Sequence, residues 1–247
     1  MRVLVTTYPF HEKIEGHQVL FNEKKSKYSQ EEIDKLLITF KPEIIIAGTE
    51  KYDIKQLDMC HDLKMISRVG VGTSSINLDE CRKRNIKVAI TADAPSNSVA
   101  ELTIANILYL ARQLHRQEMW LKAIGRELSE CKIGIIGYGR IGKKVVSLLK
   151  HFNPKDVYIN DIFLEHSVSL DKIFSQCDII TFHTPSLDKE LDINDFNKMK
   201  KNVCIINTAR ADYINEDDLY VWLSKNSNAS AALDVFKKEP YQKGKLL

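Results

Sequence analysis

Paired cysteines, long apolar runs and a leader segment are missing from this sequence. Its five cysteines stand far apart with no Cys-X-X-Cys pair, which favours buried thiols in a reducing compartment over a disulfide framework. Metal ligation or nucleophilic chemistry by these cysteines is the less favoured alternative. No apolar run approaches the roughly 20 residues of a membrane-spanning helix, and the first residues turn polar too soon for a signal peptide. We therefore expect a cytoplasmic protein that lies outside membranes and binds no metal.

Glycine and proline are also scarce, and neither sign of charge is in large excess. Only 10 glycines and 6 prolines occur in 247 residues, which excludes collagen-like and linker-rich chains. The 36 Lys and Arg residues nearly balance the 33 Asp and Glu residues, and the net charge of +3 predicts no nucleic-acid partner. With 44% apolar and 28% charged residues, the composition is that of a globular protein of one or two domains.

Short apolar runs rich in valine and isoleucine alternate with amphipathic stretches of helical length. Continuous hydrophobicity is typical of parallel strands that helices cover on both faces. The expected strands are residues 3–6, 44–47, 65–69, 88–90, 133–136, 157–159, 179–182, 203–206 and 229–233. The expected helices are residues 30–40, 78–85, 99–114, 141–149, 170–175 and 216–223. This order predicts a doubly wound α/β architecture.

A domain boundary is expected near residue 95. Four strand–helix units precede it and can form one small sheet, a long helix spans residues 99–112, and a second series of strands begins at Cys131. We therefore expect two lobes, residues 1–95 and residues 96–247, with a cleft between them.

The strongest local motif is a Gly-X-Gly-X-X-Gly sequence formed by Gly137, Gly139 and Gly142. An apolar strand precedes it and an amphipathic helix follows, and this context turns a weak pattern into a dinucleotide-binding fingerprint. We expect Gly137 to allow a tight turn, Gly139 to let a pyrophosphate approach the backbone, and Gly142 to let the helix pack closely on the strand. The helix begins with Arg140 and Ile141, and this end of it offers free N–H groups and a partial positive charge to the phosphates.

An acidic residue, Asp161, ends the following strand 19 positions after Gly142. A carboxylate at this place accepts hydrogen bonds from the adenosine ribose and repels a 2′-phosphate. Ile162 and Phe163 follow it, so no basic side chain is there to receive that phosphate. The sequence therefore predicts NAD rather than NADP as the cofactor, with a surface cap as the less favoured role of Asp161.

Several ordered motifs over nearly the whole chain resemble the D-isomer-specific 2-hydroxyacid dehydrogenases, a family that includes the phosphoglycerate dehydrogenases. The motifs are, in chain order, Arg68-Val-Gly-Val-Gly72, Asp93-Ala-Pro-Ser-Asn-Ser-Val-Ala-Glu-Leu102, the glycine motif with Asp161, Phe182-His-Thr-Pro185, Ile206-Asn-Thr-Ala-Arg210 and Ala231-Ala-Leu-Asp-Val-Phe-Lys-Lys-Glu-Pro240. The resemblance implies a flavodoxin-like substrate-binding lobe and a Rossmann NAD-binding lobe. It also implies hydride transfer between NAD(H) and a small 2-hydroxy or 2-oxo acid, with 3-phosphoglycerate-like acids among the candidates.

The resemblance also implies roles for individual residues. Arg210 is expected to fork onto the carboxylate and the carbonyl oxygen of the substrate, and Glu239 to orient a catalytic histidine. Cofactor contacts are implied for His183, Thr208, Ala209 and Asp234, the last of which would hold the nicotinamide carboxamide. The substrate loop is implied to consist of Arg68, Val69, Gly70, Val71 and Gly72, with the backbone N–H groups of residues 69–72 cradling the carboxylate. A surface salt bridge is the alternative role of Arg210, and a helix or turn cap that of Asp234.

The sequence departs from the family pattern at its end. The family's proton donor is a histidine in a Thr-Pro-His segment well beyond the glutamate, and this sequence ends at Leu247, eight residues after Glu239. The resemblance therefore implies that the last strand of the Rossmann lobe and the C-terminal return helix are missing. We expect reduced activity, because loss of a general acid costs about 10²–10⁴ in rate.

The same departure leaves the oligomeric state and the activity as open expectations. A strand at residues 229–233 that lies at the sheet edge needs a partner, which predicts a homo-oligomer, a dimer, with a mass above the 28.3 kDa of one chain. A second hypothesis is a non-catalytic NAD(H)-binding or interaction module, and a third is a truncated product with neither role. An NADH titration followed by a panel of 2-oxo acids distinguishes the three.

Overall fold

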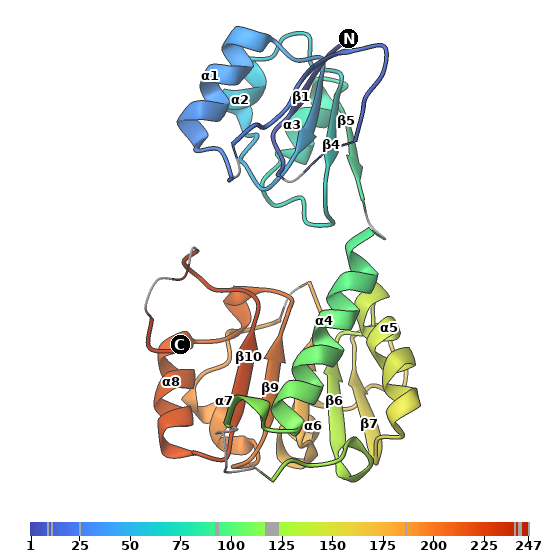
Figure 1. The fold of residues 1–247 in the computed structure, drawn as a ribbon, viewed down its shortest axis with the longest axis vertical. Coiled ribbons are helices and arrows are strands. Elements are labelled where there is room, and N and C mark those ends of the chain that lie inside the picture. Colours follow the sequence, from blue (N-terminus) through green and yellow to red (C-terminus); the bar gives the residue numbers. More distant parts are fainter. Residues whose placement is uncertain are drawn as a thin grey trace. The chain divides into compact units, whose positions relative to one another are not determined.

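Two compact units make up the chain in the computed structural model, Met1–Pro95 and Ser96–Leu247 (Figure 1). The structure describes residues 1–8, 10, 12–24, 26–91, 94–116, 124–185, 187–239, 241 and 244–246. Within this part of the chain, no helix is long and apolar enough to cross a membrane. Each unit is built on its own five-stranded parallel sheet.

The first unit has the strand order β2-β1-β3-β4-β5. Its strands are β1 (Arg2–Val5), β2 (Gln18–Leu20), β3 (Ile44–Ala47), β4 (Met65–Arg68) and β5 (Lys87–Ile90). Its helices are α1 (Gln30–Phe40), α2 (Ile54–Asp58) and α3 (Leu78–Lys83). All neighbouring strands are parallel and their order is the flavodoxin-like one, so the predicted fold class of this lobe is confirmed.

Polar side chains fix where the helices of the first unit begin. The Ser29 hydroxyl accepts the N–H of Glu32 at 3.3 Å, and the Glu32 carboxylate accepts the N–H of Ser29 at 2.8 Å, which makes a capping box for α1. Asp53 forms a capping box with Gln56 at the start of α2, and the Asn77 side chain caps α3 by accepting the N–H of Glu80. The sequence did not predict β2 or α2, because segments of three and five residues are too short to show a hydrophobic period.

The second unit has the strand order β10-β9-β8-β6-β7. Its strands are β6 (Lys132–Ile136), β7 (Asp156–Asn160), β8 (Ile179–Phe182), β9 (Cys204–Asn207) and β10 (Ser230–Leu233). Its helices are α4 (Ala94–Ala111), which begins just before the boundary, α5 (Arg140–Leu149), α6 (Leu170–Gln176), α7 (Ile193–Lys198) and α8 (Glu216–Lys225). Short 3₁₀ turns lie at Leu114–Arg116, Leu128–Glu130, Lys150–Phe152 and Ala211–Tyr213.

The strand order of the second unit contains a switch point. β6 pairs with β7 on one side and with β8 on the other, so the chain crosses back over β6 after β7. Ligands of open parallel sheets bind at such a point, beyond the carboxyl ends of the strands. The predicted Rossmann class is confirmed, and β10 forms an edge of the sheet, as expected for residues 229–233.

Strands of the second sheet send alternate side chains to opposite faces. Around β9, Cys204 and Ile206 pack among residues of α4 and α5, whereas Val203 and Ile205 pack among residues of α6, α7 and α8. This is the two-residue period of a strand. Because helices cover both faces, both sets are apolar, and the sequence shows continuous rather than alternating hydrophobicity.

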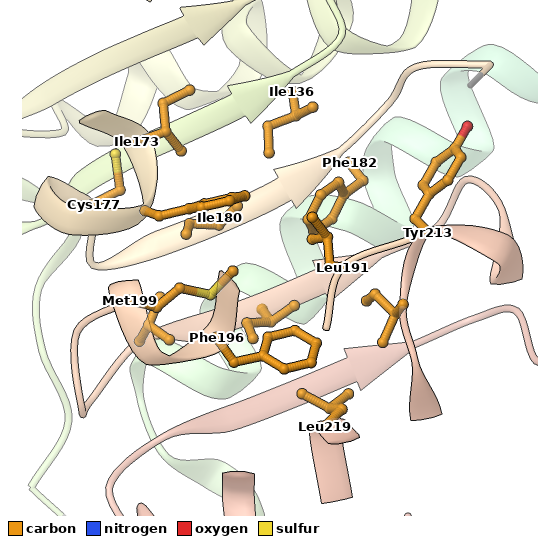
Figure 2. Packing of buried hydrophobic residues seen from close by; sticks show 14 of the residues in the cluster. Ile136, Ile173, Cys177, Ile180, Phe182, Leu191, Phe196, Met199, Tyr213 and Leu219 are labelled. Carbon is orange, nitrogen blue, oxygen red and sulfur yellow. The ribbon is translucent and has the colours of Figure 1, made fainter. Parts of the chain in front are cut away.

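The face that α6, α7 and α8 cover contains a cluster of large aromatic side chains (Figure 2). Phe182 of β8, Phe196 of α7 and Leu219 of α8 have no exposed surface. The rings of Phe196 and Trp222 lie 6.1 Å apart with an interplanar angle of 39°. Such tilted aromatic contacts add to the stabilisation that burial provides. This packing holds β8 and β9, whose ends carry candidate site residues.

We expect Leu219→Ala to lower the free energy of unfolding by about 2–5 kcal/mol, because it removes a fully buried side chain from this cluster. Val221 lies two residues further along α8 and is 41% exposed. Val221→Ala is therefore the matched control and should change that free energy by less than about 0.5 kcal/mol. Urea unfolding followed by tryptophan fluorescence measures both, and equal losses in the two variants would contradict the packing described.

Candidate cofactor and substrate site

The glycine-rich loop leaves the end of β6 and turns at Gly137. This residue has a φ of +96°, in the region that favours glycine. Its N–H donates to the carbonyl oxygen of Asn160, at the end of β7, at 2.8 Å. A Cβ atom here would lie 2.4 Å from the backbone nitrogen of Thr184, closer than real contacts allow. Gly137 is therefore required both by the turn and by the segment that follows β8.

The other two glycines of the motif meet different surroundings. A Cβ atom on Gly142 would lie 2.1 Å from the carbonyl oxygen of Gly137, so the first turn of α5 packs on the loop as well as on the strand. A Cβ atom on Gly139 would meet no atom within 4 Å. Gly139 is the N-cap of α5 and provides no side-chain cap, so a phosphate can accept hydrogen bonds from the first N–H groups of the helix. The fold itself therefore does not need a glycine at position 139.

Asp161 is tied to the same loop. One oxygen of its carboxylate accepts the N–H of Tyr138 at 2.6 Å, and the other accepts the N–H of Phe163 at 2.9 Å. A carboxylate oxygen has two lone-pair directions, so both oxygens keep capacity for the ribose hydroxyls. Ile162 and Phe163 are each 89% exposed. The segment beyond Asp161 thus presents apolar side chains where a 2′-phosphate would need a cation.

His183 follows β8 and lies beside Gly137. Its N–H donates to the carbonyl oxygen of Ile136 at 2.6 Å, and its Nε2 lies 3.0 Å from the hydroxyl of Thr181. Its buried Nδ1 has no hydrogen-bond partner among the described residues. Burial lowers the pKa of His183 to about 4, so the ring is neutral at neutral pH. A neutral imidazole can position a ligand by a hydrogen bond, but it is a poor proton donor.

The segment after β9 carries Thr208, Ala209 and Arg210. Arg210 is exposed, and its Nη1 donates to the carbonyl oxygen of Ala209 at 2.7 Å. The hydroxyls of Thr208 and Thr103 lie 3.1 Å apart and are buried. Because Thr103 donates its single hydroxyl hydrogen to the carbonyl oxygen of Val99 at 2.8 Å, Thr208 must donate to Thr103. The Thr208 hydroxyl is left as an acceptor, and it joins the end of β9 to α4.

Asp234 and Glu239 follow β10. The N–H of Asp234 donates to the carbonyl oxygen of Asn207 at 2.9 Å, which continues the pairing of β10 with β9. The Glu239 carboxylate accepts the N–H of Phe236 at 3.1 Å. Partial burial and the negative charge of Glu239 both raise the pKa of Asp234. The two carboxyl groups are therefore close enough to interact, and Glu239 closes a turn of its own segment.

The predicted substrate loop belongs to the first unit and follows β4. Gly70 has a φ of +134°, and a Cβ atom there would lie 2.5 Å from Nη1 of Arg68. The N–H of Val69 donates to the carbonyl oxygen of Ala47 at 2.9 Å, and that of Gly70 donates to the Thr91 hydroxyl at 2.7 Å. Bonds within the unit therefore already use two of the four N–H groups of residues 69–72 that were expected to cradle a carboxylate.

The structure places most of the predicted cofactor residues at the carboxyl ends of the strands of the second sheet. The glycine loop, Asp161 and His183 follow β6, β7 and β8, and the remaining predicted residues of this unit follow β9 and β10. Arg68 to Gly72 lie at the corresponding edge of the first sheet. Parallel strands explain this, because their carboxyl ends meet at the same edge.

Sequence reasoning missed the residues that hold these groups in place. Asn207, Thr91 and Thr103 bond to backbone or hydroxyl groups of predicted site residues. For Asn207 a signal existed, because an amide ends an otherwise apolar strand directly before Thr208. The two threonines have no such signal, since their partners lie far away along the sequence.

We expect Gly139→Ala to weaken NADH binding at least about 10-fold, a loss of about 1.4 kcal/mol, because the added methyl group meets the pyrophosphate and no protein atom. The melting temperature should stay within about 2 °C of the parent, as for other substitutions that meet no neighbour. Gly142→Ala is the comparison and should lower the melting temperature of the free protein. NADH fluorescence titration and thermal unfolding measure the two effects. Unchanged NADH affinity in Gly139→Ala would show that the loop is not the pyrophosphate site, and a lower melting temperature would show that the methyl group meets the protein itself.

Comparison with known proteins agrees with this geometry. Residues 101–247 match the family described as D-isomer specific 2-hydroxyacid dehydrogenase, NAD binding domain. The chain is 31% identical to a hydroxypyruvate reductase of Thermotoga maritima, over 92% of this chain and 80% of that protein. It is 32% identical to the D-3-phosphoglycerate dehydrogenase of Homo sapiens, over 80% of this chain and 40% of the longer human enzyme.

Solved structures show the same architecture. The NAD⁺-bound 3-phosphoglycerate dehydrogenase of Entamoeba histolytica superposes with a TM-score of 0.79 at 25% identity, over 97% of this chain and 82% of that one. The predicted family and the predicted NAD cofactor are confirmed by these matches. The chain belongs to the D-isomer specific 2-hydroxyacid dehydrogenases, a family of NAD-dependent oxidoreductases, and its second unit is the NAD-binding domain.

Proposed function

We propose that this chain binds NAD(H) at the glycine loop and takes part in hydride transfer between NAD(H) and a small 2-hydroxy or 2-oxo acid. The observation that carries the proposal is the set of groups that follow the parallel strands of the second unit. Gly139 leaves an open face at the start of α5, Asp161 is bonded to the same loop, and Arg210 extends from the end of β9. The first two suit a dinucleotide, and the third suits a carboxylate.

Reduction of a 2-oxo acid consumes one hydride from NADH and one proton, and it yields NAD⁺ and a 2-hydroxy acid. Negative charge develops on the former carbonyl oxygen as the hydride arrives. We propose that Arg210 leaves its bond to the Ala209 carbonyl and forks onto the substrate's carboxylate and that oxygen. Asp234 is proposed to hold the nicotinamide carboxamide. Glu239 is proposed to orient the histidine that the family uses as proton donor, a role for which none of the seven histidines is placed in this sequence. His183 is not suited to supply the proton, because its pKa is about 4.

The two units are proposed to divide the work. Residues 1–95 would supply backbone N–H groups to the acid, and residues 96–247 would supply the cofactor site and Arg210. In the first unit, Val69 and Gly70 use their N–H groups internally, so we assign the substrate carboxylate to the N–H groups of Val71 and Gly72. The first acids to test are hydroxypyruvate, with NADH, and 3-phosphoglycerate, since two relatives are named for them. Because 3-phosphoglycerate is a 2-hydroxy acid, it is tested with NAD⁺ and the gain of nicotinamide absorbance.

The test is an NADH fluorescence titration followed by a panel of 2-oxo acids with loss of nicotinamide absorbance as the readout. We expect NADH binding, and we expect Arg210→Ala to lower kcat/KM for the best acid by at least about 10², the usual cost of losing a group that stabilises developing charge. Arg82→Ala is the matched control, because Arg82 lies on the exposed surface of α3, paired with Asp79.

The outcomes separate the proposed function from its alternatives. NADH binding without turnover of any acid supports a non-catalytic NAD(H)-binding module. Turnover that Arg210→Ala leaves unchanged would show that Arg210 does not bind the substrate. Absence of NADH binding would overturn the whole proposal.

We also propose that the protein acts in the cytoplasm as a homodimer. The cysteines at positions 60, 81, 131, 177 and 204 are free and buried, which supports a reducing compartment. α4 has a single charged residue, Glu101, among its 18 residues. Leu102, Ala105 and Tyr109 form an exposed stripe along it. This stripe can pair with its own copy across a two-fold axis near Ala105, with each Leu102 against the partner's Tyr109.

We expect a mass of about twice 28.3 kDa by light scattering coupled to size-exclusion chromatography. Tyr109→Lys should shift the protein to one chain per particle, because it places a charge in the apolar stripe. Lys35→Ala, a change on α1 outside the stripe, should leave the mass unchanged. A parent protein that elutes with the mass of a single chain would overturn the dimer.

A further inference from the structure

Asn207 ends β9 and is only 1% exposed. Its Oδ1 accepts the N–H of Ala209 at 3.0 Å, and its Nδ2 donates to the carbonyl oxygen of Arg210 at 2.7 Å. Its own carbonyl oxygen accepts the N–H of Asp234 at 2.9 Å. One buried residue is therefore bonded to three residues that the proposed function places at the cofactor or the substrate.

The chemistry of the amide explains why this side chain is needed here. The N–H of Ala209 and the carbonyl oxygen of Arg210 both point at the side chain of residue 207. That side chain must therefore accept one hydrogen bond and donate another. A short side chain that both accepts and donates in a fixed plane meets this demand. A carboxylate keeps the acceptor and loses the donor, and an apolar side chain loses both. The buried carbonyl or N–H left without its partner then costs free energy.

These bonds determine how the chain leaves the strand. The amide of Asn207 closes the turn from Ala209 to Arg210, and Arg210 leaves it in an extended conformation with φ −144° and ψ 139°. The bond to Asp234 fixes the end of β10 against the same residue. The position of the Arg210 backbone relative to that of Asp234 therefore depends on Asn207, although Asn207 itself is buried.

We propose that Asn207 is a positioning residue for substrate binding, because it holds the backbone of Arg210 at a fixed place beside Asp234. This inference rests on the proposed function, in which Arg210 binds the carboxylate of the acid. It predicts that loss of the Nδ2 donor weakens binding of the acid much more than binding of the cofactor. In the proposed function, the phosphates and the ribose of the cofactor bind to the glycine loop and to Asp161. The hydrogen bonds of Asn207 named above go to Ala209, Arg210 and Asp234 instead.

The test uses the NADH-loaded full chain and oxalate, a dianion with the adjacent oxygen pairs of a 2-oxo acid. Calorimetric titration gives the Kd of oxalate, and NADH fluorescence gives the Kd of the cofactor. For Asn207→Asp we expect the Kd of oxalate to rise at least about 10-fold, or about 1.4 kcal/mol, with the Kd of NADH within about 3-fold of the parent.

A matched control is available on α8. Asn226 also donates from Nδ2 to a backbone carbonyl, that of Trp222, at 2.7 Å, but it lies at the end of α8, outside the proposed site. Asn226→Asp should therefore leave both dissociation constants unchanged while it costs comparable thermal stability. Asn207→Ser, whose hydroxyl can make only one of the two bonds in good geometry, serves if Asn207→Asp does not fold.

The outcomes separate this inference from the function on which it rests. If Arg210→Ala weakens oxalate binding and the Asn207 variants do not, the positioning role is overturned and the proposed function stands. If the Asn207 variants weaken oxalate and NADH equally, Asn207 supports the fold alone, and the positioning role is again overturned. If Arg210→Ala leaves oxalate binding unchanged, the proposed role of Arg210 fails first.

Discussion

The close approach of two backbones at Gly137 is the constraint on which the rest of the site depends. The loop after β6 passes so near the peptide of His183 and Thr184 that no side chain fits between them. α5 then starts directly on this loop, with Gly142 against the Gly137 carbonyl. Both contacts fix the first turn of α5 before any ligand is bound. Of the three glycines of the motif, Gly139 is the one at which a Cβ atom would meet no protein atom, and it is the position at which we propose that the pyrophosphate approaches the backbone.

The parallel sheet extends this constraint to the other candidate residues. Asp161, His183, Thr208 and Asp234 each come directly or almost directly after a strand, so the strand register sets their places along one edge. Short bonds then join neighbouring ends: Asp161 to Tyr138, and Asn207 to Ala209, Arg210 and Asp234. The apolar cluster beneath, shown in Figure 2, holds the strands that carry these ends. The positions of the candidate cofactor-site residues therefore depend on how the core packs.

Much of the fold could be predicted from the sequence because its strands are buried on both faces and therefore appear as continuous apolar runs. β2 and α2 were not predicted because three and five residues are too few to show a hydrophobic period. α7, with six residues, was also not predicted. Among the candidate site residues, the glycine motif and Asp161 could be predicted from their spacing and from the strand and helix expected around them. The internal use of the Val69 and Gly70 N–H groups could not be predicted, because their partners are Ala47, at the end of β3, and Thr91, directly after β5. Pairings of this kind depend on the tertiary fold.

We expect the second unit to recognise NAD through the glycine loop, with Asp161 and the apolar residues after it excluding a 2′-phosphate. A pair of fluorescence titrations of the full chain, one with NADH and one with NADPH, tests this recognition. We expect NADH to bind at least about 10-fold more tightly, a difference of about 1.4 kcal/mol. Equal affinities, or tighter binding of NADPH, would contradict it.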